Sequence, residues 1–298
     1  MSRLSNLQLY ALTVLIWGST WHAIIYQLAQ TSPELGVTVR FALAGAAVLA
    51  FAAWRGERIL LPLRAQGPLA LQGLFMYSLS YLCVYHAERH VPSGLVAVGY
   101  SASPLLAGVG AWLLWRGELS ARFIAGGLLG LAGVAAIFWP ELAGASARPT
   151  AALGLVLTVA AVLLSTVGSL AASRNAQRGL SFWPALGTSL LWGALASALV
   201  VQAAGQPWRL PAVASWWLSL AWLSAAGTVV AFSCFLTLQQ RLGPGKASAV
   251  GVMTPVVALA VSTAFEGYSP DLFTLAGATL AVAGNGLMLK PDAAPATG

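Results

Sequence analysis

The sequence predicts an all-α integral membrane protein whose ten transmembrane helices form two inverted five-helix repeats around a central cavity. Three observations predict this fold: scarce charge, ten long apolar runs and an internal repeat. Of 298 residues, 58% are hydrophobic and 8% are charged, whereas about a quarter are charged in soluble domains. So little charge cannot cover a water-facing surface, and lipid is therefore the expected solvent. The 31 Gly and 12 Trp residues agree, because both types are frequent in membrane spans or at their ends.

Each of the ten apolar runs has about the length that crosses a bilayer and is bounded by charge, Pro or Gly. In the first half the runs start after Arg3, at Pro33, and after Arg64, His90 and Arg122, and they cover 7–28, 33–54, 66–86, 91–115 and 123–139. In the second half they start after Pro149, Gly179 and Pro211, at Pro244, and after Asp271, and they cover 151–173, 181–202, 212–238, 244–265 and 272–289.

The basic residues of the connectors predict the orientation, because cytoplasmic loops are enriched in Lys and Arg. An N-terminus in the cytoplasm places eleven basic residues inside: Arg3, Arg55, Arg58, Arg64, Arg116, Arg122, Arg174, Arg178, Arg241, Lys246 and Lys290. Only Arg89, Arg148 and Arg209 then lie outside, and Arg40 lies within the second span. We therefore expect both termini in the cytoplasm.

The second half repeats the first at an offset of 151 residues. This offset pairs Cys83 with Cys234, Pro104 with Pro255, Gly126 with Gly277, and Gly133 with Gly284. Since each half holds an odd number of spans, the halves 1–145 and 146–298 enter the membrane from opposite sides. Inverted repeats are typical of transporters that bind a solute near the bilayer midplane and alternate between two arrangements.

Other classes of function have little support in the sequence. The net charge of +7 is spread singly along the chain, which disfavours nucleic-acid binding. The two Cys form no metal-binding spacing. An intramembrane enzyme needs a nucleophile and base, or a metal set, at depth, and no such set is present. We therefore expect no enzymatic activity, no cofactor and no metal.

Two prolines lie near the centres of their spans, Pro104 in the fourth and Pro255 in the ninth. A proline there removes a hydrogen bond to the carbonyl four residues earlier and bends the helix. Membrane helices also tolerate proline without functional reason. The matching positions favour two hinges beside the binding site.

Aromatic and small polar residues are predicted to line that site. Tyr77, Tyr81 and Tyr85 recur every four residues on the third span, and a buried polar tip at mid-depth needs a partner. The alternative is ordinary packing between helices. The full predicted set consists of Trp17, Trp21, Tyr77, Tyr81, Tyr85, Tyr100, Ser165, Ser169 and Thr228.

Charged groups within the spans are few. Arg40 lies about two turns into the second span, where an unpaired cation is unfavourable. Its candidate partners are a solute carboxylate, Glu88 or backbone carbonyls, and His86 is a second possible charge partner. A proton antiporter that uses a membrane carboxylate is disfavoured, because no Asp or Glu is expected at mid-depth. His22 and His86 are the remaining groups that titrate near neutral pH, although packing explains both.

Several segments resemble the EamA repeat of the drug/metabolite transporter superfamily: Trp17-Gly18-Ser19, the Arg within the second span, Val91-Pro92-Ser93, Ser103-Pro104-Leu105 and Gly117-Glu118-Leu119-Ser120. The second half repeats part of this pattern as Thr254-Pro255-Val256 and Phe265-Glu266-Gly267. The seventh span lacks the Arg, so strict symmetry between the halves is not expected. Within the superfamily the chain is similar to YddG-type aromatic amino-acid exporters of the bacterial inner membrane.

The resemblance implies ten helices, a cavity between the halves and export of amino acids such as Phe, Trp and Tyr. Together with the residue pattern it predicts an inner-membrane exporter of amino acids and related metabolites that works by alternating access. The alternative is a multidrug exporter of the same fold. The expected partners are a small-molecule solute and the lipid bilayer, and the sequence leaves the oligomeric state open, a monomer included.

Overall fold

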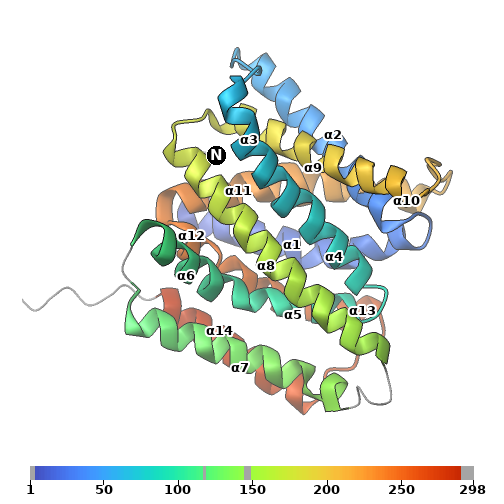
Figure 1. Ribbon diagram of the computed structural model, residues 1–298. Helices are drawn as coiled ribbons and strands as arrows, with labels where there is room; N and C mark the ends of the chain where they lie inside the picture. The colour runs from blue at the N-terminus through green and yellow to red at the C-terminus, as the bar shows by residue number, and fades with distance from the viewer. Residues whose placement is uncertain (1–3, 117–118, 144–148, 290–298) are drawn as a thin grey trace, which may run out of the picture.

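The computed structural model describes residues 4–116, 119–143 and 149–289, and in these residues all regular structure is helical. The helices run from left to right across Figure 1, some nearly horizontally and others sloping down towards the right. The first half contains α1 (Asn6–Leu28), α2 (Pro33–Trp54), α3 (Leu63–Gly73), η1 (Leu74–Leu79), α4 (Ser80–Ala87), α5 (Ser93–Gly99), η2 (Tyr100–Ala102), α6 (Ser103–Trp115) and α7 (Ala121–Ala143). The second half contains α8 (Pro149–Gln177), α9 (Phe182–Ala203), α10 (Ala214–Ala221), η3 (Trp222–Val230), α11 (Ala231–Leu242), α12 (Pro244–Ala247), α13 (Val250–Phe265) and α14 (Leu272–Leu289).

These elements give the ten expected spans. Eight continuous helical runs among the described residues are long and apolar enough to cross a membrane. The fifth and tenth spans, α7 and α14, contribute shorter apolar runs. The third span joins α3, η1 and α4, and the eighth joins α10, η3 and α11, so each crosses as one continuous run.

Local signals place several helix ends. At the start of α1, the Ser5 hydroxyl accepts a hydrogen bond from the Gln8 amide while the Gln8 side chain accepts one from the Ser5 amide. Pro33 is suited to the first turn of α2, where its missing N–H needs no partner. At the other ends, Gly56 and Gly179 follow α2 and α8 with φ of 74° and 75°, a conformation that favours glycine.

Close glycine contacts show how the two halves are related. α7 packs along α14, where a Cβ on Gly126 would lie 2.5 Å from the Gly284 carbonyl oxygen and one on Gly133 would lie 2.5 Å from that of Gly277. A two-fold rotation that exchanges the repeat-related glycines converts the first contact into the second. The α7–α14 pair forms one edge of the molecule and the α2–α9 pair the opposite edge (Figure 1). The inverted repeat is therefore present in the packing.

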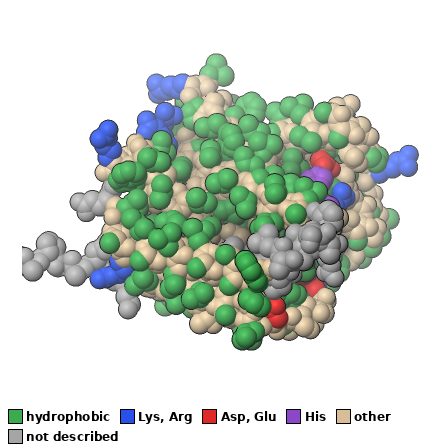
Figure 2. Space-filling model, turned by 60° about the horizontal axis from the view of Figure 1, so that its bottom comes forward, with side chains coloured by type: hydrophobic (Ala, Val, Ile, Leu, Met, Phe, Trp, Pro, Cys, Tyr) green, Lys and Arg blue, Asp and Glu red, His purple; other side chains and the backbone are tan. Residues whose placement is uncertain are grey.

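The surface agrees with a lipid environment. Large apolar side chains such as Leu15, Leu163 and Leu199 are exposed along the spans. Figure 2 shows hydrophobic side chains over most of the visible face, with most Lys and Arg at one end and the acidic and His side chains near the other. An apolar band between two charged ends is the surface that a bilayer requires.

Candidate functional site

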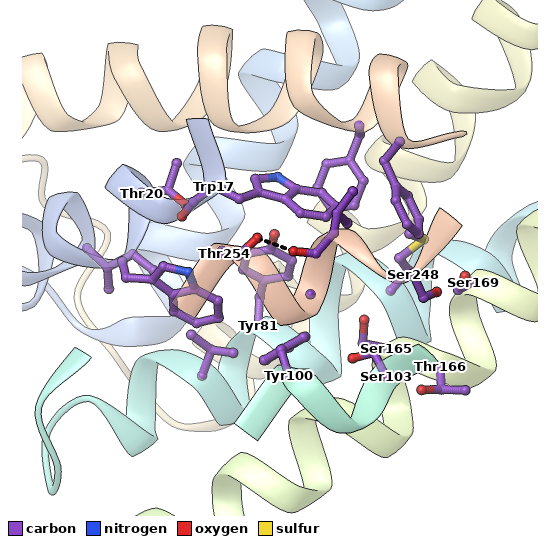
Figure 3. A pocket seen from close by; sticks show the side chains of 18 residues that line it. Trp17, Thr20, Tyr81, Tyr100, Ser103, Ser165, Thr166, Ser169, Ser248 and Thr254 are labelled. Carbon is purple, nitrogen blue, oxygen red and sulfur yellow. Dashed lines mark hydrogen bonds between the residues drawn. The ribbon is translucent and has the colours of Figure 1, made fainter. Parts of the chain in front are cut away.

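A cavity lies between the two halves, at the centre of the bundle (Figure 3). It is lined by residues of spans one, three and four and of spans six, eight and nine: Trp17, Thr20, Trp21, Ile24, Met76, Tyr81, Val84, Tyr100, Ser103, Ser165, Thr166, Ser169, Phe232, Phe235, Ser248, Val250, Gly251 and Thr254. Both halves contribute corresponding helices, as the inverted repeat predicts.

The lining repeats the internal symmetry residue by residue. At the offset of 151, Tyr81 corresponds to Phe232, Val84 to Phe235, Tyr100 to Gly251 and Ser103 to Thr254, and both members of each pair line the cavity. The repeat could therefore have identified Phe232 and Phe235. The sequence analysis missed them because it selected aromatic side chains that end in a polar group. The cavity lies on the pseudo-two-fold axis of the molecule.

The aromatic wall is held mainly by ring contacts. The Trp17 ring lies 5.0 Å from that of Phe232 and 5.2 Å from that of Phe235 between centroids, and the Trp21 ring lies 5.3 Å from that of Tyr100. The Trp17 indole N–H donates to the Gly227 carbonyl at 3.1 Å. The Trp21 indole N–H is buried without a hydrogen-bond partner. It is therefore an unsatisfied donor on a side chain that lines the cavity.

Small polar side chains form the remaining wall, and some of their hydroxyls donate hydrogen bonds to backbone carbonyls of their own helices. Thr166 donates to the Val162 carbonyl and Thr254 to the Val250 carbonyl, at 2.8 Å and 2.7 Å. Figure 3 shows these hydroxyls with those of Ser103, Ser165 and Ser248 around one cavity. The wall therefore combines apolar rings with hydroxyl groups, an environment suited to a planar solute with a polar end.

Six of the nine predicted binding residues line the cavity, and three do not. Trp17, Trp21, Tyr81, Tyr100, Ser165 and Ser169 line it. Tyr77 and Tyr85 are fully buried outside it. The π-helix η1 (Leu74–Leu79) includes Tyr77 and alters the helical phase there, and a spacing of four residues also drifts around an α-helix. Tyr77 and Tyr81 both contact the rings of Phe41 and Phe232, but of the three tyrosines Tyr81 alone lines the cavity.

Thr228 is the third predicted residue outside the lining, and it belongs to a second π-helix, η3. Its hydroxyl accepts a hydrogen bond from Arg40 Nε at 3.1 Å and donates to the Leu223 carbonyl, five residues earlier, at 2.8 Å. η1 and η3 occupy corresponding positions in the third and eighth spans. π-Helices are frequent at functional sites because they redirect side chains, and here η3 aims Thr228 at Arg40.

Arg40 itself is almost fully buried, with 1% of its surface exposed. Its guanidinium carbon lies 4.7 Å from the Tyr81 ring centroid and 5.1 Å from that of Phe41. Its two terminal nitrogens have no hydrogen-bond partner, and in the described part of the chain no Asp or Glu oxygen lies within 4.0 Å. Of the three partners considered from the sequence, neither Glu88 nor a backbone carbonyl is therefore bonded to these nitrogens.

Polar side chains connect the helices at the end where α4 and α13 finish. Glu266 accepts hydrogen bonds from Ser93 at 2.6 Å and from His22 at 3.1 Å. His86 pairs with Glu34 at 2.8 Å, so its charge partner is a residue of this chain. At this end, which is the outer one in the predicted orientation, one group of contacts therefore links spans one, four and nine, and another links spans two and three. Among the described residues, no three His, Cys, Asp or Glu side chains gather closely enough to hold a metal ion.

The opposite end contains a second, larger hollow. Its volume is about 470 Å³, against about 80 Å³ for the central cavity. Gln239 lines the hollow, Ser169 lines the cavity, and the Gln239 amide donates to the Ser169 carbonyl and hydroxyl at 2.9 Å and 2.8 Å. A single side-chain contact therefore links α11 to α8 between the two spaces.

The two mid-span prolines have different surroundings. Pro104 follows the 3₁₀ turn η2 and begins α6, and the Tyr100 carbonyl accepts from the Ser103 amide. Pro255 lies inside α13, which continues through it, and the ninth span is interrupted earlier, between α12 and α13. Gly251 lies against the Tyr100 carbonyl, where a Cβ would be 2.7 Å from the oxygen. The fourth and ninth spans thus meet at their irregular segments.

Ten apolar spans, arranged as two inverted halves around a central cavity, define a membrane transporter of small molecules. Residues 5–139 and 148–290 each match the EamA-like transporter family, and the chain belongs to this family, within the drug/metabolite transporter superfamily. Its class implies transport rather than catalysis, with a small-molecule solute and lipid as partners.

Curated relatives from several bacteria support the assignment. The chain is 28% identical to the uncharacterized inner membrane transporter YedA of Escherichia coli K12, over 87% of this chain and 82% of YedA. It is 22% identical to protein PagO of Salmonella typhimurium (90% and 88% covered) and 27% identical to the uncharacterized transporter YvbV of Bacillus subtilis (92% and 88%). A crystal structure with 21% sequence identity shares the fold, with a TM-score of 0.72 over 95% of this chain and 96% of the other.

Proposed function

We propose that this transporter exports amino acids, aromatic ones in particular, across the bacterial inner membrane by alternating access. The observation that carries this proposal is the lining of the central cavity. Rings from both halves provide apolar surfaces for a planar side chain, and hydroxyls with the free Trp21 N–H provide polar contacts for a head group. Trp17, Trp21, Tyr81, Tyr100, Ser165 and Ser169 are the proposed contacts.

The proposed orientation places both termini and the larger hollow on the cytoplasmic side. Arg174, Arg178 and Arg241 lie at the ends of α8 and α11, beside the hollow, where the positive-inside rule expects them. A solute then enters through the hollow, passes Gln239 and Ser169, and leaves at the end closed by Glu266. The halves 1–145 and 146–298 exchange their arrangements, with Pro104 and Pro255 as hinges in the fourth and ninth spans.

Transport by the purified protein tests this proposal. Proteoliposomes should exchange labelled Phe or Trp across the membrane faster than empty vesicles, and Trp17→Ala should reduce the exchange at least fivefold by removing a wall of the cavity. Trp54→Ala is the matched control, because Trp54 is 81% exposed at the end of α2. Exchange equal to that of empty vesicles for every amino acid would contradict the proposal. If cells gained drug resistance without amino-acid efflux, the multidrug alternative would stand instead.

A further inference from the structure

The guanidinium of Arg40 is a buried cation whose terminal nitrogens lack hydrogen-bond partners. Only Nε is bonded, to Thr228. The Tyr85 hydroxyl, which lies near the guanidinium, donates to the Gln27 side chain at 2.9 Å. A buried charge with unsatisfied donors is unfavourable unless an anion joins it. The terminal nitrogens of Arg40 are thus buried donors available to an acceptor.

The guanidinium of Arg40 lies close to two side chains that line the cavity. Its carbon faces the Tyr81 ring, which lines the cavity. On another side, a Cβ on Gly227 would lie 3.4 Å from Nη2 and 2.6 Å from the Thr20 side chain, and Thr20 also lines the cavity. Figure 3 shows Thr20 and Tyr81 on different helices around the same space. Arg40 therefore lies directly behind a wall made by these two side chains.

A second buried ionisable side chain, that of Glu88, lies in this region. Glu88 lies one helical turn after Val84, at the end of α4. Both of its carboxyl oxygens are buried without a hydrogen-bond partner. Glu88 is nonetheless more than 4.0 Å from Arg40, since no ion pair joins them. Because Glu88 forms no ion pair with Arg40, the terminal nitrogens of Arg40 remain available to a ligand.

We propose that Arg40 binds the carboxylate of the transported solute, which enters between Thr20 and Tyr81 while the rest of the solute occupies the aromatic cavity. The guanidinium then makes two parallel hydrogen bonds to the carboxylate, the geometry for which Arg is suited. This inference rests on the proposed function and narrows it: the solutes are aromatic carboxylates or zwitterions, and organic cations are repelled. The site is asymmetric, because the seventh span has no corresponding Arg.

Competition in proteoliposomes tests the charge that the site requires. In wild-type vesicles, unlabelled Phe and 3-phenylpropanoate should inhibit the exchange of labelled Phe, whereas phenylalaninamide and phenethylamine, which lack the carboxylate, should be at least about tenfold weaker. Arg40→Gln should reduce Phe exchange at least tenfold and remove this preference. Arg40→Lys keeps the positive charge but not the planar guanidinium group. It should therefore retain part of the Phe exchange and part of the preference for carboxylates. Arg55→Gln is the matched control, because Arg55 lies at the exposed end of α2.

Three outcomes would overturn the inference. In the first, the Arg40→Gln variant exchanges Phe as fast as the wild type. In the second, the variant folds normally but its exchange of every solute falls equally, which indicates a positioning role for Arg40. Glu88→Gln could reproduce the loss in full, which indicates that Arg40 pairs with Glu88 in another conformation.

A second measurement separates this inference from the proposed function. In detergent, 3-phenylpropanoate should raise the melting temperature of the wild type but not that of Arg40→Gln. If no amino acid is transported but this stabilisation remains, the amino-acid proposal fails and the carboxylate site stands. If amino acids are transported and no stabilisation is seen with any aromatic carboxylate, the carboxylate site fails.

Discussion

Two tryptophans one turn apart on α1 differ in what their indole nitrogens do. Trp17 donates to the Gly227 carbonyl, whereas the Trp21 N–H is buried without a partner. Trp21→Phe should therefore leave the melting temperature unchanged or slightly higher, since it removes an unsatisfied donor. If the solute accepts that hydrogen bond, the same change should raise the KM for exchange about fivefold to tenfold.

Trp17→Phe is the control for this prediction, because it removes a hydrogen bond that the chain itself makes. It should lower stability by about 1 kcal/mol. Thermal melts of both variants, together with exchange kinetics, give the comparison. A Trp21→Phe variant with wild-type KM would show that the indole nitrogen does not contact the solute.

Glu88 carries a residue-scale prediction about pH. Burial raises the pKa of Glu88 well above its ordinary value of 4.5, the Glu266 carboxylate raises it further, and Arg40 opposes both. An acid whose folded pKa is raised stabilises the fold below that pKa, and this stability is lost as the pH rises from about 4.5 through the folded value. Glu88→Gln should therefore match the wild type at pH 5 and melt at a higher temperature at pH 8.

The groups around Glu88 determine how this difference is read. Glu266 is bonded to His22 and Ser93, and Arg40 lies on α2. His22 is present in both proteins, so the difference between them isolates Glu88. Parallel melting curves across the whole pH range would show that Glu88 does not change its protonation there.

At the scale of elements, the glycine contacts between α7 and α14 support a packing prediction. A Cβ on Gly284 would lie 2.4 Å from the Gly126 carbonyl oxygen, and backbone atoms cannot move away as a side chain can. Gly284→Ala should therefore destabilise the protein by about 1–3 kcal/mol, the usual effect of overpacking. Gly286→Ala on the same helix meets open space and should be neutral or stabilising, because Ala favours helix. Equal melting temperatures for both variants would contradict the packing.

The elements also show what the sequence could predict. Span limits were within a few residues because apolar length is a local property, and the repeat offset located the Gly126 and Gly284 helices as a symmetric pair. The face of a span was harder to predict, since the π-helix η1 moved Tyr77 out of the cavity. The bond between Arg40 and Thr228 joins residues 188 positions apart, and no periodicity reports such a contact.

For the whole molecule, the contact between the hollow and the central cavity predicts how access of the solute to the cavity is controlled. The hollow and the cavity are linked by the bonds from Gln239 to Ser169. Gln239 corresponds to Glu88 at the offset of 151, so the repeat places a polar side chain at each end of the cavity. The proposed alternating access requires that the two ends open in turn, and at the end proposed to be the inner one this requires the Gln239 bonds to break.

Gln239→Leu should therefore open the inner end more often. With Cys83 and Cys234 replaced by Ser, a Cys introduced at Ser165 in the cavity should react with a membrane-impermeant maleimide at least threefold faster in inside-out vesicles when Gln239 is Leu. Gln240→Leu is the matched control, because Gln240 lines the same hollow but is not the residue that donates to Ser169. Labelling that increases only in right-side-out vesicles would reverse the proposed orientation, and unchanged labelling from both sides would show that this contact does not control access.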